Sequence, residues 1–189
     1  MIELLSKFEA KQNKESSLAW YGTKLVWGNE AYLHVIYKPA TTALLAEVSE
    51  EFEFPESLIH FYSKTNGASL FLASLTCRGV VICGCLERES KLTRDLEASP
   101  VDIRTLNRRN RDFVAFGAYG YDGSTLLVDK RSGLVQCTLG RDLTKIRKSW
   151  KSIDNWMDDE FVRMCDLFSK DGSCLTNCEG LLPPSQMLQ

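Results

Sequence analysis

The chain has 189 residues, 44% of them hydrophobic and 25% charged, which is enough to bury a core in a single domain. Its 23 basic and 25 acidic side chains give a formal net charge of −2, a balance that argues against direct binding of nucleic acid or of an anionic membrane. No apolar run approaches the roughly 20 residues that span a bilayer, and the N-terminus lacks the pattern of a secretory signal. We therefore expect a cytoplasmic protein whose seven cysteines are thiols.

The first forty residues divide into two parts. Residues 1–17 have the spacing of a short amphipathic helix, which becomes polar toward its end. Residues 20–37 mix aromatic and β-branched side chains with glycines at turn positions, a composition typical of a short hairpin. Pro39 ends this segment.

Two amphipathic helices are predicted next. Thr41 or Thr42 can cap a helix that runs to Phe52 with its apolar side chains on one face. A second helix begins at Pro55, where the missing N–H loses no hydrogen bond, and Asn66-Gly67 is expected to close its last turn. The apolar run 70–73 then predicts a buried strand.

The remaining pattern indicates a sheet followed by a last helix. Further strands are expected at 79–86, 113–117, 125–128 and 134–139, with turns at 119–124 and 129–133. Residues 87–111 form a polar insert. An amphipathic helix is predicted from Ser149-Trp150 to about Phe168, and residues 170–189 are expected to be an irregular tail.

Three of these segments resemble the SUKH superfamily, which holds many bacterial immunity proteins and the fungal cell-wall assembly regulators. The first carries the family pattern through Pro55, Leu58, Phe61, Tyr62, Asn66 and Gly67. The second, a hairpin block, matches through Phe116, Gly117, Asp122, Gly123, Leu126, Asp129, Gly133 and Val135. The third is the last helix with its serine–aromatic start. Ala68 departs from the pattern, because many members have a second glycine there.

Residues and resemblance together predict an α+β fold. We expect one domain over 1–189, with N-terminal helices packed on a largely antiparallel sheet that a C-terminal amphipathic helix closes. The resemblance covers about residues 40–168, which leaves an N-terminal extension at 1–39 and the tail at 170–189.

No catalytic constellation is found in the sequence. His34 and His60 have no suggestive nucleophile or acid nearby, and the glycines of 117–123 do not form a phosphate loop. Cys83-x-Cys85 is a poor pair for joint chelation, and Cys174 and Cys178 lack a second pair to complete a zinc site. The basic run 104–111 is interpreted as a solvated insert. We therefore expect no cofactor, no metal and no enzymatic activity, although a metal-dependent or small-ligand enzyme remains a third interpretation.

The resemblance implies a non-catalytic immunity protein that binds and occludes a cognate toxin domain, such as a nuclease or another toxic enzyme. The alternative is a regulatory or scaffold module like the fungal relatives. Aromatic residues in glycine-containing loops and acidic residues on helix faces are the candidate partner contacts. These candidates are Trp20, Trp27, Glu50, Glu51, Tyr119, Tyr121, Asp122, Asp158 and Asp159.

Overall fold

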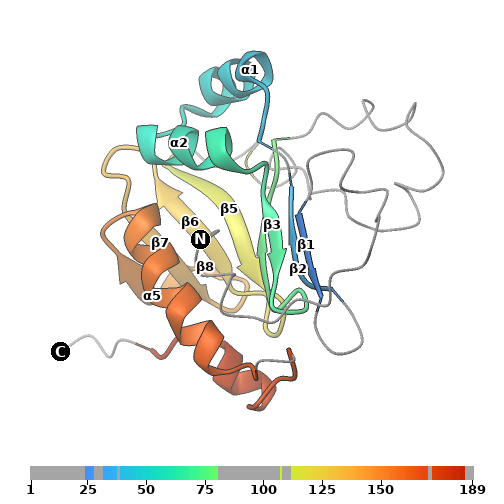
Figure 1. Cartoon of the computed structure of the whole chain (residues 1–189). Coiled ribbons are helices and arrows are strands. Elements are labelled where there is room, and N and C mark those ends of the chain that lie inside the picture. The colour runs from blue at the N-terminus through green and yellow to red at the C-terminus, as the bar shows by residue number, and fades with distance from the viewer. Residues whose placement is uncertain are drawn as a thin grey trace.

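A computed structural model gives the fold of the chain and describes residues 24–27, 32–37, 39–80, 107, 112–169 and 172–185. Within these ranges an antiparallel sheet packs against helices, which confirms the predicted α+β class (Figure 1). The described residues form eight strands that follow one another in chain order, and each pairs with its neighbours in sequence. The strands are β1 (Lys24–Trp27), β2 (Tyr32–Ile36), β3 (Ala68–Leu70), β4 (Leu75–Cys77), β5 (Phe113–Tyr119), β6 (Thr125–Asp129), β7 (Val135–Leu139) and β8 (Asp142–Trp150).

The helices lie at one end of the sheet and across one of its faces. Helices α1 (Thr42–Phe52) and α2 (Glu56–Lys64) cover the end, and α5 (Ile153–Asp166) crosses the face (Figure 1). The Thr41 side chain accepts the Leu44 N–H at 3.3 Å and so caps α1 as predicted. A short 3-10 helix, η3 (Cys178–Leu181), follows α5.

The Asn66-Gly67 pair has a different role from the one expected. Helix α2 already ends at Lys64, so the pair does not close its last turn. The Asn66 side-chain oxygen accepts the Val80 N–H at 2.7 Å, which ties the start of β3 to the chain beyond β4. Gly67 has a φ of +90°, and a Cβ added there would lie 2.6 Å from the Cys77 carbonyl oxygen. Glycine is needed here for a close approach of two backbones.

Two further boundaries correct the sequence predictions. The strand expected at 70–73 lies earlier, since β3 ends at Leu70 and Phe71, Leu72 and Ala73 form a turn with φ values of 52°, 54° and 62°. The helix expected from Ser149-Trp150 starts later, because β8 continues to Trp150 and Ser152 caps α5 by accepting the Asn155 N–H. Strand β8 was not predicted at all.

The core lies between the sheet and the helices α1, α2 and α5. Aromatic rings connect the layers: Phe116 of β5 meets Trp156 of α5 edge-on, with ring centroids 5.2 Å apart. Phe71 contacts Phe161 of α5 at the same separation. Edge-to-face and tilted contacts of this kind add to the stabilisation that burial itself provides.

Candidate functional site

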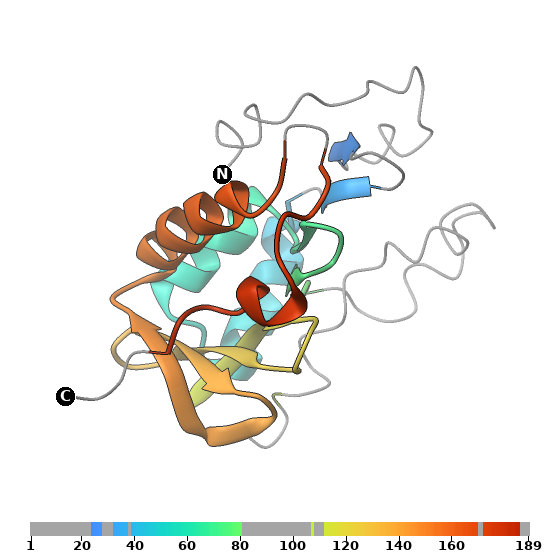
Figure 2. The ribbon, with the colours of Figure 1, turned by 90° about the horizontal axis from the view of Figure 1, so that it is seen from below.

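Every second turn of a sequential antiparallel sheet lies at the same end. The turns 71–74, 120–124 and 140–141 share one end, which we call the turn end and which Figure 2 views from below. The Gly120 N–H donates to the Ser74 carbonyl at 3.0 Å, and the Gly140 N–H donates to the Ser124 hydroxyl at 3.0 Å. Hydrogen bonds therefore link the three turns into one row.

Large apolar side chains are exposed along this row. The turn surface, as we define it, consists of Leu72, Tyr121, Leu139 and Leu143, whose exposed fractions are 43%, 52%, 44% and 48%. A single exposed leucine needs no explanation, but four such side chains in or directly beside adjoining turns are the kind of patch that marks interaction sites. Tyr121 is the most exposed of them and is a residue type enriched at the centres of protein interfaces.

Buried hydroxyl groups hold the backbone beneath the turn surface. Thr138 is fully buried; its hydroxyl accepts the Thr125 N–H at 2.8 Å and donates to the Gly140 carbonyl at 2.7 Å. Ser124, equally buried, is the group that accepts from Gly140. Because these groups are satisfied internally, the turns are already fixed before any partner arrives.

Asp122 stabilises the 120–124 turn and links it to Arg147 of β8. One carboxylate oxygen accepts the Ser124 N–H at 2.8 Å, and the other lies 3.5 Å from the Arg147 guanidinium. Arg147 also donates to the Pro183 carbonyl at 3.4 Å, in the segment that returns across this end of the molecule toward β8 (Figure 2). Asp122, predicted as a partner contact, is thus mainly a structural residue.

A fully buried carboxylate lies deeper, on α5. Glu160 is 0% exposed, accepts the Tyr119 hydroxyl at 2.8 Å and pairs with Arg163 at 2.8 Å and with Lys148 at 3.5 Å. Burial, and then the nearby Glu160, raise the pKa of Tyr119 well above its ordinary value, so the phenol stays protonated and donates. Glu160 therefore does not share the exposed face of α5 that carries its neighbour Asp158.

Arg163 extends this cluster to the segment after α5. Its guanidinium donates to the Gly180 carbonyl at 3.0 Å and to the Leu181 carbonyl at 2.8 Å, at η3. Leu182 is buried beside this attachment. One buried anion thus connects a helix, a strand and the returning segment.

The position of Glu160 in the sequence indicates that it is buried, although glutamate is a residue type that is ordinarily exposed. It lies four residues after Trp156 and four before Met164, and both of these side chains are buried on α5. A helix places such positions on the same face. The spacing therefore indicated burial, and Arg163, three residues further on, was the natural partner.

The structure places the predicted aromatic contacts differently from expectation. Tyr119 was expected in a loop, but it ends β5 and is 1% exposed, so the prediction that it faces a partner is wrong. Trp27 lies in β1 rather than in a loop. Trp20 lies outside the described residues. Tyr121 is exposed at the turn end, where a contact was predicted.

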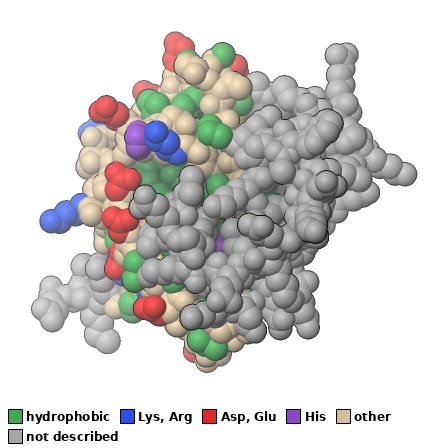
Figure 3. Space-filling model, in the orientation of Figure 1, with side chains coloured by type: hydrophobic (Ala, Val, Ile, Leu, Met, Phe, Trp, Pro, Cys, Tyr) green, Lys and Arg blue, Asp and Glu red, His purple; other side chains and the backbone are tan. Residues whose placement is uncertain are grey.

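The predicted acidic contacts on α1 do not adjoin the turn surface. Glu50 and Glu51 are exposed on α1, and the 129–133 turn reaches that region through a 3.2 Å contact between Lys130 and Glu53. This turn lies at the opposite end of β6 from residues 120–124, and we call its location the helix end. Figure 3 shows acidic side chains over α1 and, separately, on the side of the molecule that carries α5.

On α5 the two predicted aspartates differ from each other. Asp158 is exposed, whereas Asp159 is hydrogen-bonded to Lys148 at 2.6 Å and accepts the Trp150 indole N–H at 2.7 Å. The hydrogen bond from Lys148, followed by that from Trp150, holds the pKa of Asp159 below its ordinary value. Asp159 therefore already has partners within the chain.

Other chemical candidates have structural explanations. His34 is buried, accepts the Phe71 N–H at its Nδ1, and has a pKa lowered to about 3 by burial, so it is neutral. Burial raises the pKa of the Cys77 and Cys137 thiols to about 12. Among the described residues no cluster of three or more potential ligands could hold a metal, while Cys83 and Cys85 lie outside those residues.

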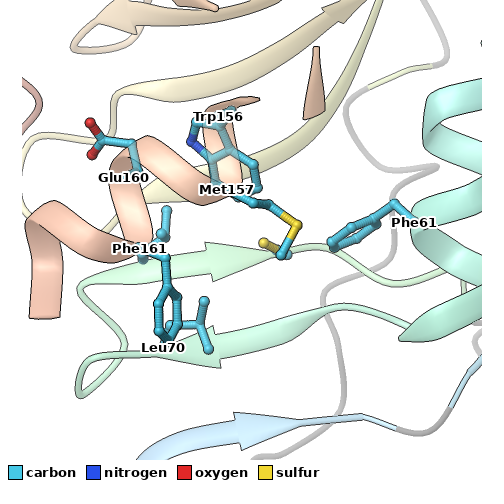
Figure 4. A pocket seen from close by; sticks show the side chains of 8 residues that line it. Phe61, Leu70, Trp156, Met157, Glu160 and Phe161 are labelled. Carbon is cyan, nitrogen blue, oxygen red and sulfur yellow. The ribbon is translucent and has the colours of Figure 1, made fainter. Parts of the chain in front are cut away.

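A small pocket between α2, α5 and the sheet offers little room. Its volume is about 10 Å³, roughly that of one water site, whereas ligand pockets span hundreds of Å³. In Figure 4 the Glu160 carboxylate points away from the apolar side chains of Phe61 and Met157. The described helices include none with the length and apolar character needed to cross a membrane.

No protein-family model matches this sequence, and no curated protein matches it either. The function of the chain is therefore inferred from its motifs and from the geometry of the turn end.

Proposed function

We propose that this chain is a non-catalytic binding protein of the SUKH type, an immunity protein that docks on a cognate toxin domain and occludes it. The sequence motifs at 55–67 and 116–135 support the family. The fold is compatible with it, because a helix pair leads into an antiparallel sheet against which an amphipathic helix packs. The observation that carries the proposal is the turn surface, which exposes Tyr121, Leu139 and Leu143 above a backbone fixed by buried hydroxyls.

The mechanism is occlusion by a preformed surface. A partner that packs on Tyr121 and the adjoining leucines gains apolar burial without first having to order the turns. Because the exposed groups are apolar and rigid, most of the affinity is expected from a few anchors, with Tyr121 foremost. An antidote has to hold a lethal enzyme, so a dissociation constant far below micromolar is required.

The test begins with capture of partners from the native host's lysate on the immobilised chain, in about 0.5 M salt to suppress weak charge contacts. Each captured protein is then expressed alone in a heterologous host. The proposal predicts that one of them arrests growth and that co-expression of this chain relieves the arrest. Captured proteins that are harmless would contradict the immunity function and favour the regulatory or scaffold alternative.

The site is tested with a paired variant. Tyr121→Ala combined with Leu139→Ala is expected to weaken binding to the purified toxin at least about ten-fold, which is about 1.4 kcal/mol, and to reduce the relief of growth arrest. Val162→Ala is the matched control, since Val162 is also a large apolar side chain and is 41% exposed, but lies on α5. If the paired variant and Val162→Ala bind the toxin with equal affinity, the turn surface is not part of the interface.

A further inference from the structure

Strand β8 forms one edge of the sheet. It is the last of the eight strands, and among the described residues β7 is its only strand partner. Nine residues at roughly 3.3 Å each make an edge of about 30 Å. An exposed edge offers main-chain N–H and C=O groups to any extended segment that can lie beside it.

The charge of this edge differs from that of the whole chain. The segment 141–151 contains one acidic residue, Asp142, and its basic residues are Arg141, Lys145, Arg147, Lys148 and Lys151. The chain as a whole is slightly acidic, with a formal charge of −2. The basic character of β8 is therefore local.

A β-bulge divides these cations into two groups. The register against β7 shifts between Cys137 and Thr138, and the consecutive residues Arg147 and Lys148 both reach acidic groups of the chain. The exposed cations are Arg141, Lys145 and Lys151, of which Lys145 lies 3.5 Å from Asp142 at a solvent-exposed site. The exposed apolar side chains between them are Leu143 and Ile146. The outward side of β8 is thus both basic and apolar.

The exposed cations and apolar side chains of β8 determine which kind of segment can pair with this edge. A second copy of the chain paired through β8 would bring the same cations opposite one another, which is unfavourable across two strands. Lysines on an edge strand are indeed a common protection against such self-association. A segment that combines acidic and apolar side chains instead offers partners to the cations, to the exposed apolar side chains and to the main chain.

We propose that β8 is the docking edge for an extended, acidic segment of the partner protein, which adds to the sheet as a further strand. This inference rests on the proposed function, because it specifies the charge and the backbone form of the partner segment that meets the chain beside the turn surface. Leu143 belongs to both surfaces and connects them.

The probe is a labelled nine-residue peptide that alternates glutamate and valine. We expect salt-sensitive binding by fluorescence anisotropy, and amide NMR shifts concentrated on residues 142–150. Arg141→Glu combined with Lys145→Glu should raise the peptide's dissociation constant at least about ten-fold. The matched control is Lys64→Glu combined with Arg131→Glu, which reverses two exposed cations near the helix end and should leave binding unchanged.

Three results would overturn the inference. The first is equal binding of a peptide with lysine in place of glutamate, and the second is a set of NMR shifts that avoids β8. The third is a dimer paired through β8, seen by light scattering and NMR, which would assign the edge to a second copy. If the peptide does not bind, while the paired Tyr121→Ala, Leu139→Ala variant has a weakened affinity for the toxin, then only the inference about β8 is contradicted. If the peptide binds and no toxin is found, only the proposed function falls.

Discussion

At the helix end of the sheet polar groups face outward, whereas at the turn end hydroxyls are inside and large apolar side chains are outside. The 129–133 turn is held by Asp129, whose carboxylate accepts the N–H groups of Arg131 at 3.0 Å and Ser132 at 2.7 Å, all at exposed sites. At the turn end Ser124 and Thr138 are fully buried and Tyr121 is half exposed. The 120–124 and 129–133 turns lie at the two ends of the same strand, β6.

The difference shows where a sheet of this kind can carry function. At the helix end α1 and α2 cover the apolar surface, so the turn there needs only a local carboxylate to hold its shape. At the turn end buried hydroxyls hold the backbone from the inside, and the outer surface exposes the apolar side chains that we propose as the partner site. Within the same turns, the buried hydroxyls stabilise the fold, and the exposed apolar side chains are proposed to bind the partner. The two roles can therefore be tested separately.

The largest effect is expected from the buried anion beneath the turn end. Glu160→Gln keeps the shape of the side chain but leaves Arg163 and Lys148 without their buried counter-charge. We expect a loss of about 3–5 kcal/mol in the free energy of unfolding, measured by urea denaturation. Asp158→Asn, an exposed neighbour on the same helix, should change it by less than about 0.5 kcal/mol. Similar stability of the two variants would mean that Glu160 does not hold this end together.

A smaller effect is expected from the buried hydroxyl of Thr138. Thr138→Val preserves the volume but leaves the buried Thr125 N–H and the Gly140 carbonyl without their partner. The expected cost is about 1–3 kcal/mol. Ser132→Ala at the helix end removes a hydroxyl from an exposed turn and should cost less than about 0.5 kcal/mol by the same measurement. Equal losses in the free energy of unfolding for Thr138→Val and Ser132→Ala would show that hydroxyl groups support the two ends of the sheet equally.

Elements with a regular apolar period were predictable from the sequence. Helices α1 and α2 and the strands β5, β6 and β7 were placed to within a few residues, because their apolar positions recur at the spacing of a helix or strand. Strand β8 was missed since its bulges break the two-residue alternation and most of its side chains are polar and exposed. The turn at Phe71–Ala73 was taken for a strand because apolar L-residues rarely adopt a left-handed conformation.

The candidate site was less predictable than the fold. Tyr121 was identified through its position in a glycine-containing turn, but Leu139 and Leu143 became part of the site only through the pairing of β7 with β8. Tyr119 was predicted to face a partner because it is an aromatic residue of a glycine-containing loop, and a carboxylate such as that of Glu160 is ordinarily exposed. Each is buried with the other as its hydrogen-bond partner, a relation between residues 41 positions apart that no local pattern contains.

The exposed apolar side chains should matter little for stability. Tyr121→Ala and Leu139→Ala are each expected to lower the free energy of unfolding by no more than about 0.5 kcal/mol, because neither side chain is buried. The same denaturation series that detects Thr138→Val measures this. A loss of more than about 2 kcal/mol for either variant would show that these side chains are part of the fold rather than a free surface.

The last prediction concerns the pKa of Asp159, which joins α5 to β8 through Lys148 and Trp150. Its lowered pKa means that it stabilises the fold fully above the ordinary aspartate value of 3.8, and that this contribution is lost as the pH falls through its lower folded pKa. Because the side chain is half exposed, the contribution is at most about 1 kcal/mol. Lys148→Met removes the hydrogen bond that is the largest cause of the lowered pKa, so the pKa of Asp159 should rise in an NMR titration of the carboxyl groups.

Asp142 is the internal control for this titration. Its pKa is lowered chiefly by the Thr144 hydroxyl and should not change in the Lys148→Met variant. A parallel rise of both would mean that the substitution disturbs β8 as a whole, and an unchanged Asp159 would mean that Lys148 does not hold it.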